Sequence, residues 1–130
     1  MVFGNRQIPE DIQLIVDHNT IERVYENKFL GVILDHKLCW KPHTDYVKSK
    51  LSKSISVIRK ASPILNPSSL HTLYCAMILP YLHYCSEVWG NTYTTTINPL
   101  VTLQKRAIRV INNVGYRDHT HTHCFYNHIY

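Results

Sequence analysis

Basic side chains give the clearest chemical signal in this sequence. The chain carries 14 Lys and Arg against 9 Asp and Glu, a formal net charge of +5. From Tyr46 to Arg117 only Glu87 interrupts the basic residues, whereas the first 45 residues are slightly acidic. The positive electrostatic field of these side chains raises the local concentration of polyanions. Such a field is typical of a nucleic-acid-binding surface. We predict sequence-independent phosphate contacts from seven side chains: Lys48, Lys53, Arg59, Lys60, Lys105, Arg106 and Arg109.

A merely solvated face is the alternative interpretation of these cations. Such a face normally carries acids among its bases, and the near absence of acids favours binding for Lys105, Arg106 and Arg109. For the four earlier cations the two interpretations are balanced.

The acidic side chains do not form the arrangement that metal-assisted nucleotidyl transfer requires. That reaction uses neighbouring carboxylates that hold two metal ions. Here the sequence has no Asp-Asp pair, and its acids are scattered. We therefore predict no catalytic residues, no metal site and no cofactor in this chain.

Histidine and cysteine residues offer a weaker metal signal. The run His119-Thr-His-Thr-His-Cys124 contains good zinc ligands, and alternate residues of an extended strand share one face. Adventitious binding is the favoured interpretation, because the run has no second ligand pair nearby. Four cysteines without paired spacing indicate reduced thiols, mostly in the core.

Membrane insertion and secretion are not expected. The longest apolar stretch, Tyr74 to Cys85, includes Pro80 and His83 and falls short of the roughly 20 residues that a spanning helix needs. The sequence begins without a cleavable signal pattern. We expect an intracellular protein of the cytoplasm and nucleus, with no membrane partner.

The elements that must position the cations begin after three strand-like runs. Residues 12–16, 21–25 and 28–34 are rich in β-branched and aromatic residues and predict a small antiparallel meander. One face of such a meander must be buried against other elements.

A basic amphipathic helix is predicted from Pro42 to about Ser62-Pro63, with Asp45 in its first turn. The cations flank its apolar stripe, Lys48 and Arg59 on one side and Lys53 and Lys60 on the other. The stripe itself consists of Val47, Leu51, Ser54, Ile55, Ile58 and Ala61.

Three further helical segments are expected. Ser68 or Ser69 can cap a helix that runs to about Leu79, and Pro80 should kink or break it. A turn or two follows, until Trp89-Gly-Asn91. The last helix begins around Ile97-Asn-Pro99, and its apolar side lies opposite Lys105, Arg106 and Arg109.

The sequence thus predicts a mostly helical α+β fold in three parts. Residues 1–41 form a β-meander, residues 42–115 a helical domain, and residues 116–130 a His- and Tyr-rich tail.

Several motifs resemble one enzyme family. The first is Lys28-Phe-Leu-Gly-Val-Ile-Leu-Asp-His-Lys-Leu-Cys-Trp-Lys-Pro-His43. Others are Ile78-Leu-Pro-Tyr-Leu-His-Tyr-Cys-Ser-Glu-Val-Trp-Gly-Asn91, Leu103-Gln-Lys-Arg-Ala-Ile-Arg-Val-Ile111 and Tyr116-Arg-Asp-His-Thr120. Together they resemble the end of the palm and the thumb of jockey-like, non-LTR (LINE-type) retrotransposon reverse transcriptases.

The resemblance implies a fragment of an RNA-directed DNA polymerase. Its helical thumb would bind a template–primer duplex of RNA and DNA, whereas the fingers and the palm with the catalytic aspartates and Mg²⁺ would lie upstream. Phe29, Leu30 and Gly31 would form a strand on the primer side. For the side chains of Phe29, Val32 and Leu34, the favoured interpretation is that they simply fill the core. Trp40 and His43 resemble the W-x-x-H pattern of the family, which a structural role at the start of the helix explains.

A different class of function stays open. The chain is alternatively a small helical protein-interaction module with no nucleic-acid role, in which apolar faces recruit a partner and the cations are incidental.

Overall fold

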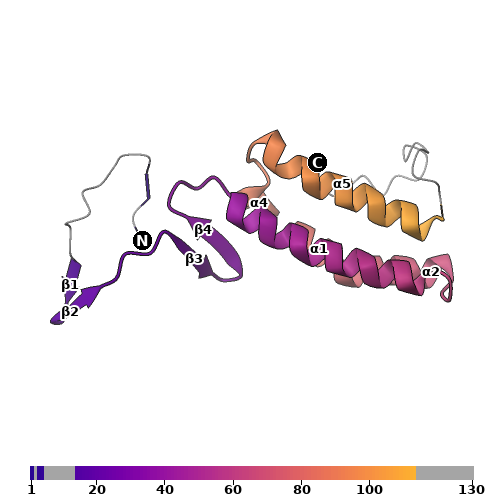
Figure 1. The fold of residues 1–130 in the computed structure, drawn as a ribbon, viewed down its shortest axis with the longest axis horizontal. Coiled ribbons are helices and arrows are strands. Elements are labelled where there is room, and N and C mark those ends of the chain that lie inside the picture. The colour runs from indigo at the N-terminus through magenta and orange to yellow at the C-terminus, as the bar shows by residue number, and fades with distance from the viewer. Residues whose placement is uncertain (2, 5–13, 114–130) are drawn as a thin grey trace. The chain divides into compact units, whose positions relative to one another are not determined.

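A computed structural model describes residues 1, 3–4 and 14–113 of the chain. The described residues form an α+β fold that is mostly helical, with two antiparallel strand pairs before a series of helices (Figure 1). This fold class is the one that the sequence predicts. The chain divides into two compact units, Met1–His43 and Thr44–Tyr130.

The first unit contains two separate β-hairpins. In one, β1 (Leu14–Val16) pairs with β2 (Asn19–Ile21), and in the other β3 (Glu26–Phe29) pairs with β4 (Val32–Asp35). The predicted meander of three strands was therefore wrong, because the third predicted strand, residues 28–34, folds back on itself. The start of the first predicted strand lies outside the described residues.

The turn at Leu30 and Gly31 causes this reversal. Phe29 faces Val32 in the strand register, so that only these two residues connect β3 to β4. Leu30 has φ 45° and Gly31 has φ 86°. Positive φ at both central residues is the requirement of the two-residue turn that matches strand twist. Glycine reaches this region without a steric penalty, so Gly31 favours the turn at this point.

The second unit begins within α1 (Lys41–Ala61), whose apolar stripe is buried. Leu51 and Ile58 are fully buried, and the Ser54 hydroxyl donates to the Met77 carbonyl at 3.1 Å, which ties α1 to α2. The observed start and end of α1 agree with the predicted ones to within one or two residues. Asp45 lies beyond the first turn of the helix, contrary to the prediction.

Four helices follow: α2 (Pro67–Met77), α3 (Leu79–His83), α4 (Ser86–Trp89) and α5 (Thr94–Ile111). The core between them includes Leu70, Tyr74, Leu82, Trp89, Leu100 and Ile108. Tyr74 on α2 accepts a hydrogen bond from the Gln104 side chain on α5 at 3.0 Å. This bond joins the two helices within the core.

The helix ends correct two predictions. Asn66, and not Ser68 or Ser69, caps α2, because its side-chain oxygen accepts the Ser69 N–H at 2.8 Å. The helix α5 begins at Thr94, before the predicted start, and contains Pro99. The predicted break at Pro80 is confirmed, since α2 ends at Met77 and a separate short helix contains Pro80.

Cys39, Cys75 and Cys85 are half-buried and form no disulfide, and Cys124 lies outside the described residues. None of the helices in the described part of the chain has the length and apolarity to cross a lipid bilayer.

Candidate nucleic-acid interface

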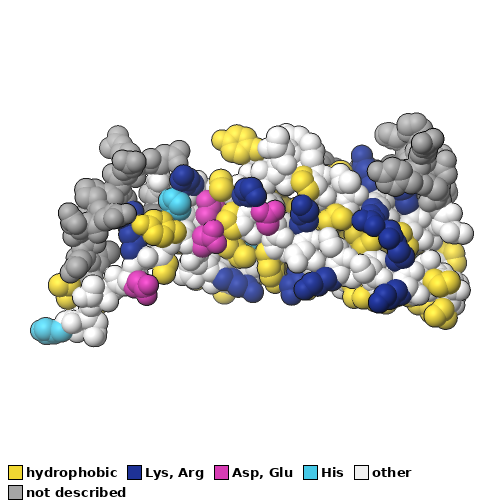
Figure 2. All heavy atoms as spheres, in the orientation of Figure 1, with side chains coloured by type: hydrophobic (Ala, Val, Ile, Leu, Met, Phe, Trp, Pro, Cys, Tyr) yellow, Lys and Arg dark blue, Asp and Glu magenta, His cyan; other side chains and the backbone are white. Residues whose placement is uncertain are grey.

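The predicted cations come from two helices. On α1, the side chains of Lys48, Lys53, Arg59 and Lys60 are exposed. On α5, Arg106 is exposed, whereas Lys105 and Arg109 are half-buried. Lys and Arg side chains spread along the visible face of the helical unit (Figure 2).

Three of the seven cations line one surface groove. Arg59 from the last turn of α1 faces the same space as Arg106 and Arg109 from the second half of α5. The groove has a volume of about 600 Å³. Its remaining lining consists of Ser62, Thr102, Leu103, Val110 and Asn113. The groove therefore combines three guanidinium groups with neutral hydrogen-bonding groups, and none of its lining residues is acidic.

The composition of the groove suits phosphate. Each guanidinium presents a fixed fork of N–H donors that can bind two oxygens of one phosphate. The Ser62 and Thr102 hydroxyls and the Asn113 amide can add neutral hydrogen bonds. Leu103 and Val110 add apolar surface that suits the less polar parts of a ligand.

Arg109 differs from the other two arginines. Its Nε atom is shielded from solvent, so that the side chain lies partly within the structure. Arginine commonly buries its stem along apolar surface while its terminal group remains near water. The sequence places Arg109 opposite the apolar side of α5, but its spacing alone gives no sign of this burial.

The four lysines lie outside this groove. Lys53 and Lys60 are seven residues apart and share one face of α1, whereas Arg59 belongs to another face of the same helix. Lys48 and Lys105 do not line the groove either. The structure thus brings three arginines together in one groove and leaves the four lysines out of its lining.

Phe29, Leu30 and Gly31 form the tip of the β3–β4 hairpin. Phe29 is 62% exposed and Leu30 is 74% exposed, whereas Val32 is buried. The favoured interpretation that Phe29 fills the core was therefore wrong, although it holds for Val32. Phe29 and Leu30 instead form an exposed apolar tip.

Asp35 organises the loop between this hairpin and α1, a role that sequence reasoning missed. Its side chain is 4% exposed and accepts N–H groups of Cys39 at 3.2 Å and Trp40 at 3.1 Å. Burial raises the pKa of Asp35, but hydrogen bonds from the Cys39 side chain and from backbone N–H groups of the loop outweigh it. The resulting pKa lies below the ordinary value of 3.8. The carboxylate therefore stays ionised and holds the loop.

Trp40 and His43 have structural positions, as the sequence predicts. Trp40 is half-buried, and its left-handed backbone (φ 60°) is held by the bond to Asp35. His43 is 2% exposed, and its Nδ1 atom accepts the Ile33 N–H at 3.3 Å. This bond places the proton of neutral His43 on Nε2, and burial lowers its pKa below 6.5.

Possible metal ligands are not grouped together among residues 1, 3–4 and 14–113. These residues contain no group of three or more His, Cys, Asp or Glu side chains placed to hold a metal ion. The predicted tail with His119, His121, His123 and Cys124 lies outside them.

Two curated proteins are similar to this chain. One is the RNA-directed DNA polymerase from mobile element jockey of Drosophila funebris, 26% identical over 100 residues. The other is the probable RNA-directed DNA polymerase from transposon BS of Drosophila melanogaster, 26% identical over 102 residues. The similarity covers 75% and 74% of this chain but only 11% of each relative. The resemblance to non-LTR retrotransposon reverse transcriptases is confirmed at this level.

The other comparisons add no relatives. No protein-family model matches the chain. No solved structure matches it either.

Proposed function

We propose that this chain is the template–primer-binding part of an RNA-directed DNA polymerase of a non-LTR retrotransposon. Its similarity to the jockey and BS polymerases supports the enzyme class. The observation that carries the binding role is the groove in which Arg59, Arg106 and Arg109 meet without an acidic neighbour in the lining.

The arginine groove, defined by these three residues, contacts phosphates and not bases. Most protein–DNA hydrogen bonds go to the phosphate and sugar backbone, and three guanidinium groups in one groove match the repeated charge of that backbone. The lysines of α1 and Lys105 add long-range attraction around the groove. Affinity for a duplex then depends on charge and strongly on salt.

The tip of the β3–β4 hairpin contacts the primer strand in the complete polymerase. Its exposed apolar side chains, Phe29 and Leu30, suit contact with a sugar or base face, and the positive φ of Gly31 lets the tip turn tightly. A primer with a photoreactive 3′-terminal base should crosslink to the hairpin in the complete enzyme. Crosslinking confined to other parts of the polymerase would refute this assignment.

Nucleotidyl transfer requires neighbouring carboxylates, and the sequence has no Asp-Asp pair. We expect the purified chain to bind a labelled RNA–DNA hybrid at low salt and to extend no primer with Mg²⁺ and nucleotides. The logarithm of the affinity should fall linearly with the logarithm of the salt concentration. Absence of binding at low salt would refute the binding role. Primer extension by this chain would refute the proposal that catalysis belongs to another part of the polymerase.

A further inference from the structure

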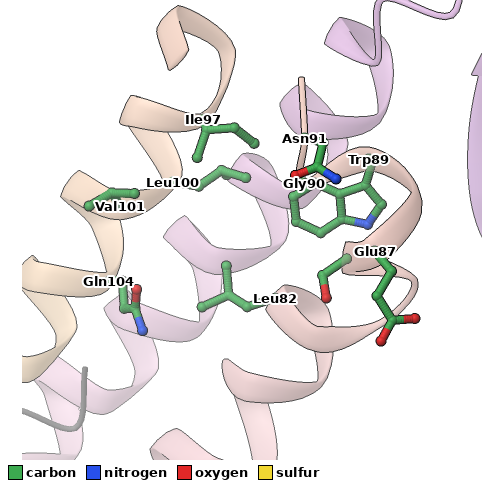
Figure 3. Close-up of a pocket in the computed structure, with 10 residues that line it drawn as sticks. Leu82, Glu87, Trp89, Gly90, Asn91, Ile97, Leu100, Val101 and Gln104 are labelled. Atoms are coloured by element: carbon green, nitrogen blue, oxygen red, sulfur yellow. The ribbon is translucent and has the colours of Figure 1, made fainter. Parts of the chain in front are cut away.

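A second cavity lies on a different face of α5. Ile97, Leu100, Val101 and Gln104 form one wall, and residues of α3, α4 and the turn after α4 form the other (Figure 3). Its volume is about 270 Å³. The arginine groove uses Thr102, Leu103, Arg106 and Arg109 of the same helix, so the two sites share no residue.

The floor of this cavity is apolar and firmly held. Leu82, Trp89 and Leu100 belong to the buried core, and the Trp89 indole N–H donates to the Tyr84 carbonyl at 2.9 Å. Gly90 is also part of the lining, and a Cβ atom there would collide with the Ser86 carbonyl oxygen. These contacts preform the cavity in the free chain.

The volume of the cavity fits a bulky apolar group. An apolar cavity of roughly 150 Å³ accepts benzene in a well-studied protein. A cavity of about 270 Å³ therefore has room for a large aliphatic or aromatic side chain. The Asn91 and Gln104 amides in the lining can bind the backbone that carries this side chain.

The edge of the cavity carries one acidic residue, Glu87, which can attract a cation. Glu87 lines the cavity, is exposed, and reaches outward from its wall (Figure 3). It is the only acidic residue between Tyr46 and Asn113, a segment otherwise rich in Lys and Arg. The Glu87 carboxylate repels phosphates and attracts a cation at this point of the rim.

We propose that this cavity docks a peptide segment of a partner protein in which a bulky apolar side chain stands next to a lysine or arginine. The apolar side chain fills the space above Leu82, Trp89 and Leu100. The neighbouring cation pairs with Glu87 at the rim. The chain thus has a protein-docking site that is independent of the arginine groove.

A labelled probe peptide tests this site on the full chain by fluorescence anisotropy. The probe carries one leucine between two lysines in a glycine-serine background. Replacement of its leucine by alanine should weaken binding roughly tenfold. Replacement of both lysines by glutamate should abolish it.

Two variants of the chain locate the binding. Glu87→Gln, an exposed rim change, should weaken the probe roughly two- to fivefold and leave hybrid binding unweakened. Val101→Phe, which fills the cavity, should abolish probe binding, with circular dichroism as the check on folding. The site is refuted if the probe does not saturate, if the alanine probe binds equally well, or if Glu87→Gln leaves probe affinity unchanged.

A second copy of the chain is the competing occupant. It would appear as a concentration-dependent dimer in analytical ultracentrifugation that Val101→Phe dissociates. That result would overturn the assignment to a partner protein.

Discussion

The side-chain carboxylate of Asp35 accepts the backbone N–H of Trp40 at 3.1 Å, across the loop that leads from β4 to α1. The other carboxylate oxygen accepts the Cys39 N–H at 3.2 Å. One buried anion therefore fixes the path of the chain into the first helix.

Replacing this anion should destabilise the first unit. We expect Asp35→Ala to lower the free energy of unfolding by about 1–3 kcal/mol, because two partly buried N–H groups lose their acceptor. Urea denaturation followed by tryptophan fluorescence measures the change. Glu22→Gln, at an exposed position, is the matched control and should shift the midpoint little. Equal midpoints for Asp35→Ala and the control would contradict this role.

His43 should make stability depend on pH. Burial holds the pKa of His43 below its ordinary value of 6.5. As the pH falls below 6.5, the unfolded chain binds a proton at His43 that the folded chain binds only at lower pH. Stability therefore falls over that window, by at most about 1.4 kcal/mol per pH unit. Asp35, whose pKa is also lowered, adds a similar loss only below its ordinary value of 3.8.

The variant His43→Asn isolates this effect. Asparagine offers an oxygen acceptor near the position of Nδ1 for the Ile33 N–H and cannot take up the proton. Urea unfolding on both sides of pH 6.5 should show a smaller pH dependence for the variant than for the natural chain. An unchanged pH dependence would assign the effect to other histidines.

Gly90 should not tolerate a side chain. A Cβ atom there meets the carbonyl oxygen of Ser86, which is backbone of α4 and cannot move cheaply. We expect Gly90→Ala to cost about 1–3 kcal/mol of stability. Val88→Ala, at an exposed position on the same helix, is the control and should cost much less. A stability of Gly90→Ala equal to that of the control would show that the turn relaxes.

The hydrogen bond between Tyr74 and Gln104 should couple α2 to α5. Tyr74→Phe removes the acceptor of the Gln104 amide and should cost about 0.5–1.5 kcal/mol. In a double-mutant cycle with Gln104→Met, the two effects should be less than additive. Strict additivity in urea denaturation would show that the bond contributes nothing to stability.

Local patterns predict much of this fold, because they report local physics. The periodicity of Val47, Leu51, Ile55 and Ile58 defines the buried face of α1. Pro80 lies in the first turn of a new helix, just after α2 ends at Met77. The error at residues 28–34 arose because a continuous apolar run conceals a two-residue turn. The strand prediction places Leu30 and Gly31 in extended backbone, whereas the turn requires positive φ at both residues.

The candidate site depends on tertiary contacts, which the sequence alone does not predict. The sequence identifies seven cations but contains no signal that Arg59 at the end of α1 meets Arg106 and Arg109 of α5. Helix packing decides which cations share a groove. The role of Asp35 was not predicted for the same reason. A single carboxylate in a loop gives no sequence signal, and its hydrogen-bond partners are seen only in the structure.

The geometry of the guanidinium groups should matter beyond their charge. Arg59→Lys combined with Arg106→Lys keeps the charge but removes the planar fork that binds two phosphate oxygens. We expect weaker hybrid binding with little change in the salt dependence. Equal affinity for the natural chain and this variant would show that the groove acts through charge alone.

The most direct test of the arginine groove compares two double variants of equal charge in a salt titration with a labelled RNA–DNA hybrid. Arg59→Gln with Arg106→Gln removes two groove cations, and Lys53→Gln with Lys60→Gln removes two exposed cations of α1 outside the groove. The arginine variant should lose most of the affinity and reduce the salt slope by up to about 2, whereas the lysine variant should lose much less. Equal losses in both variants would contradict a groove-centred interface.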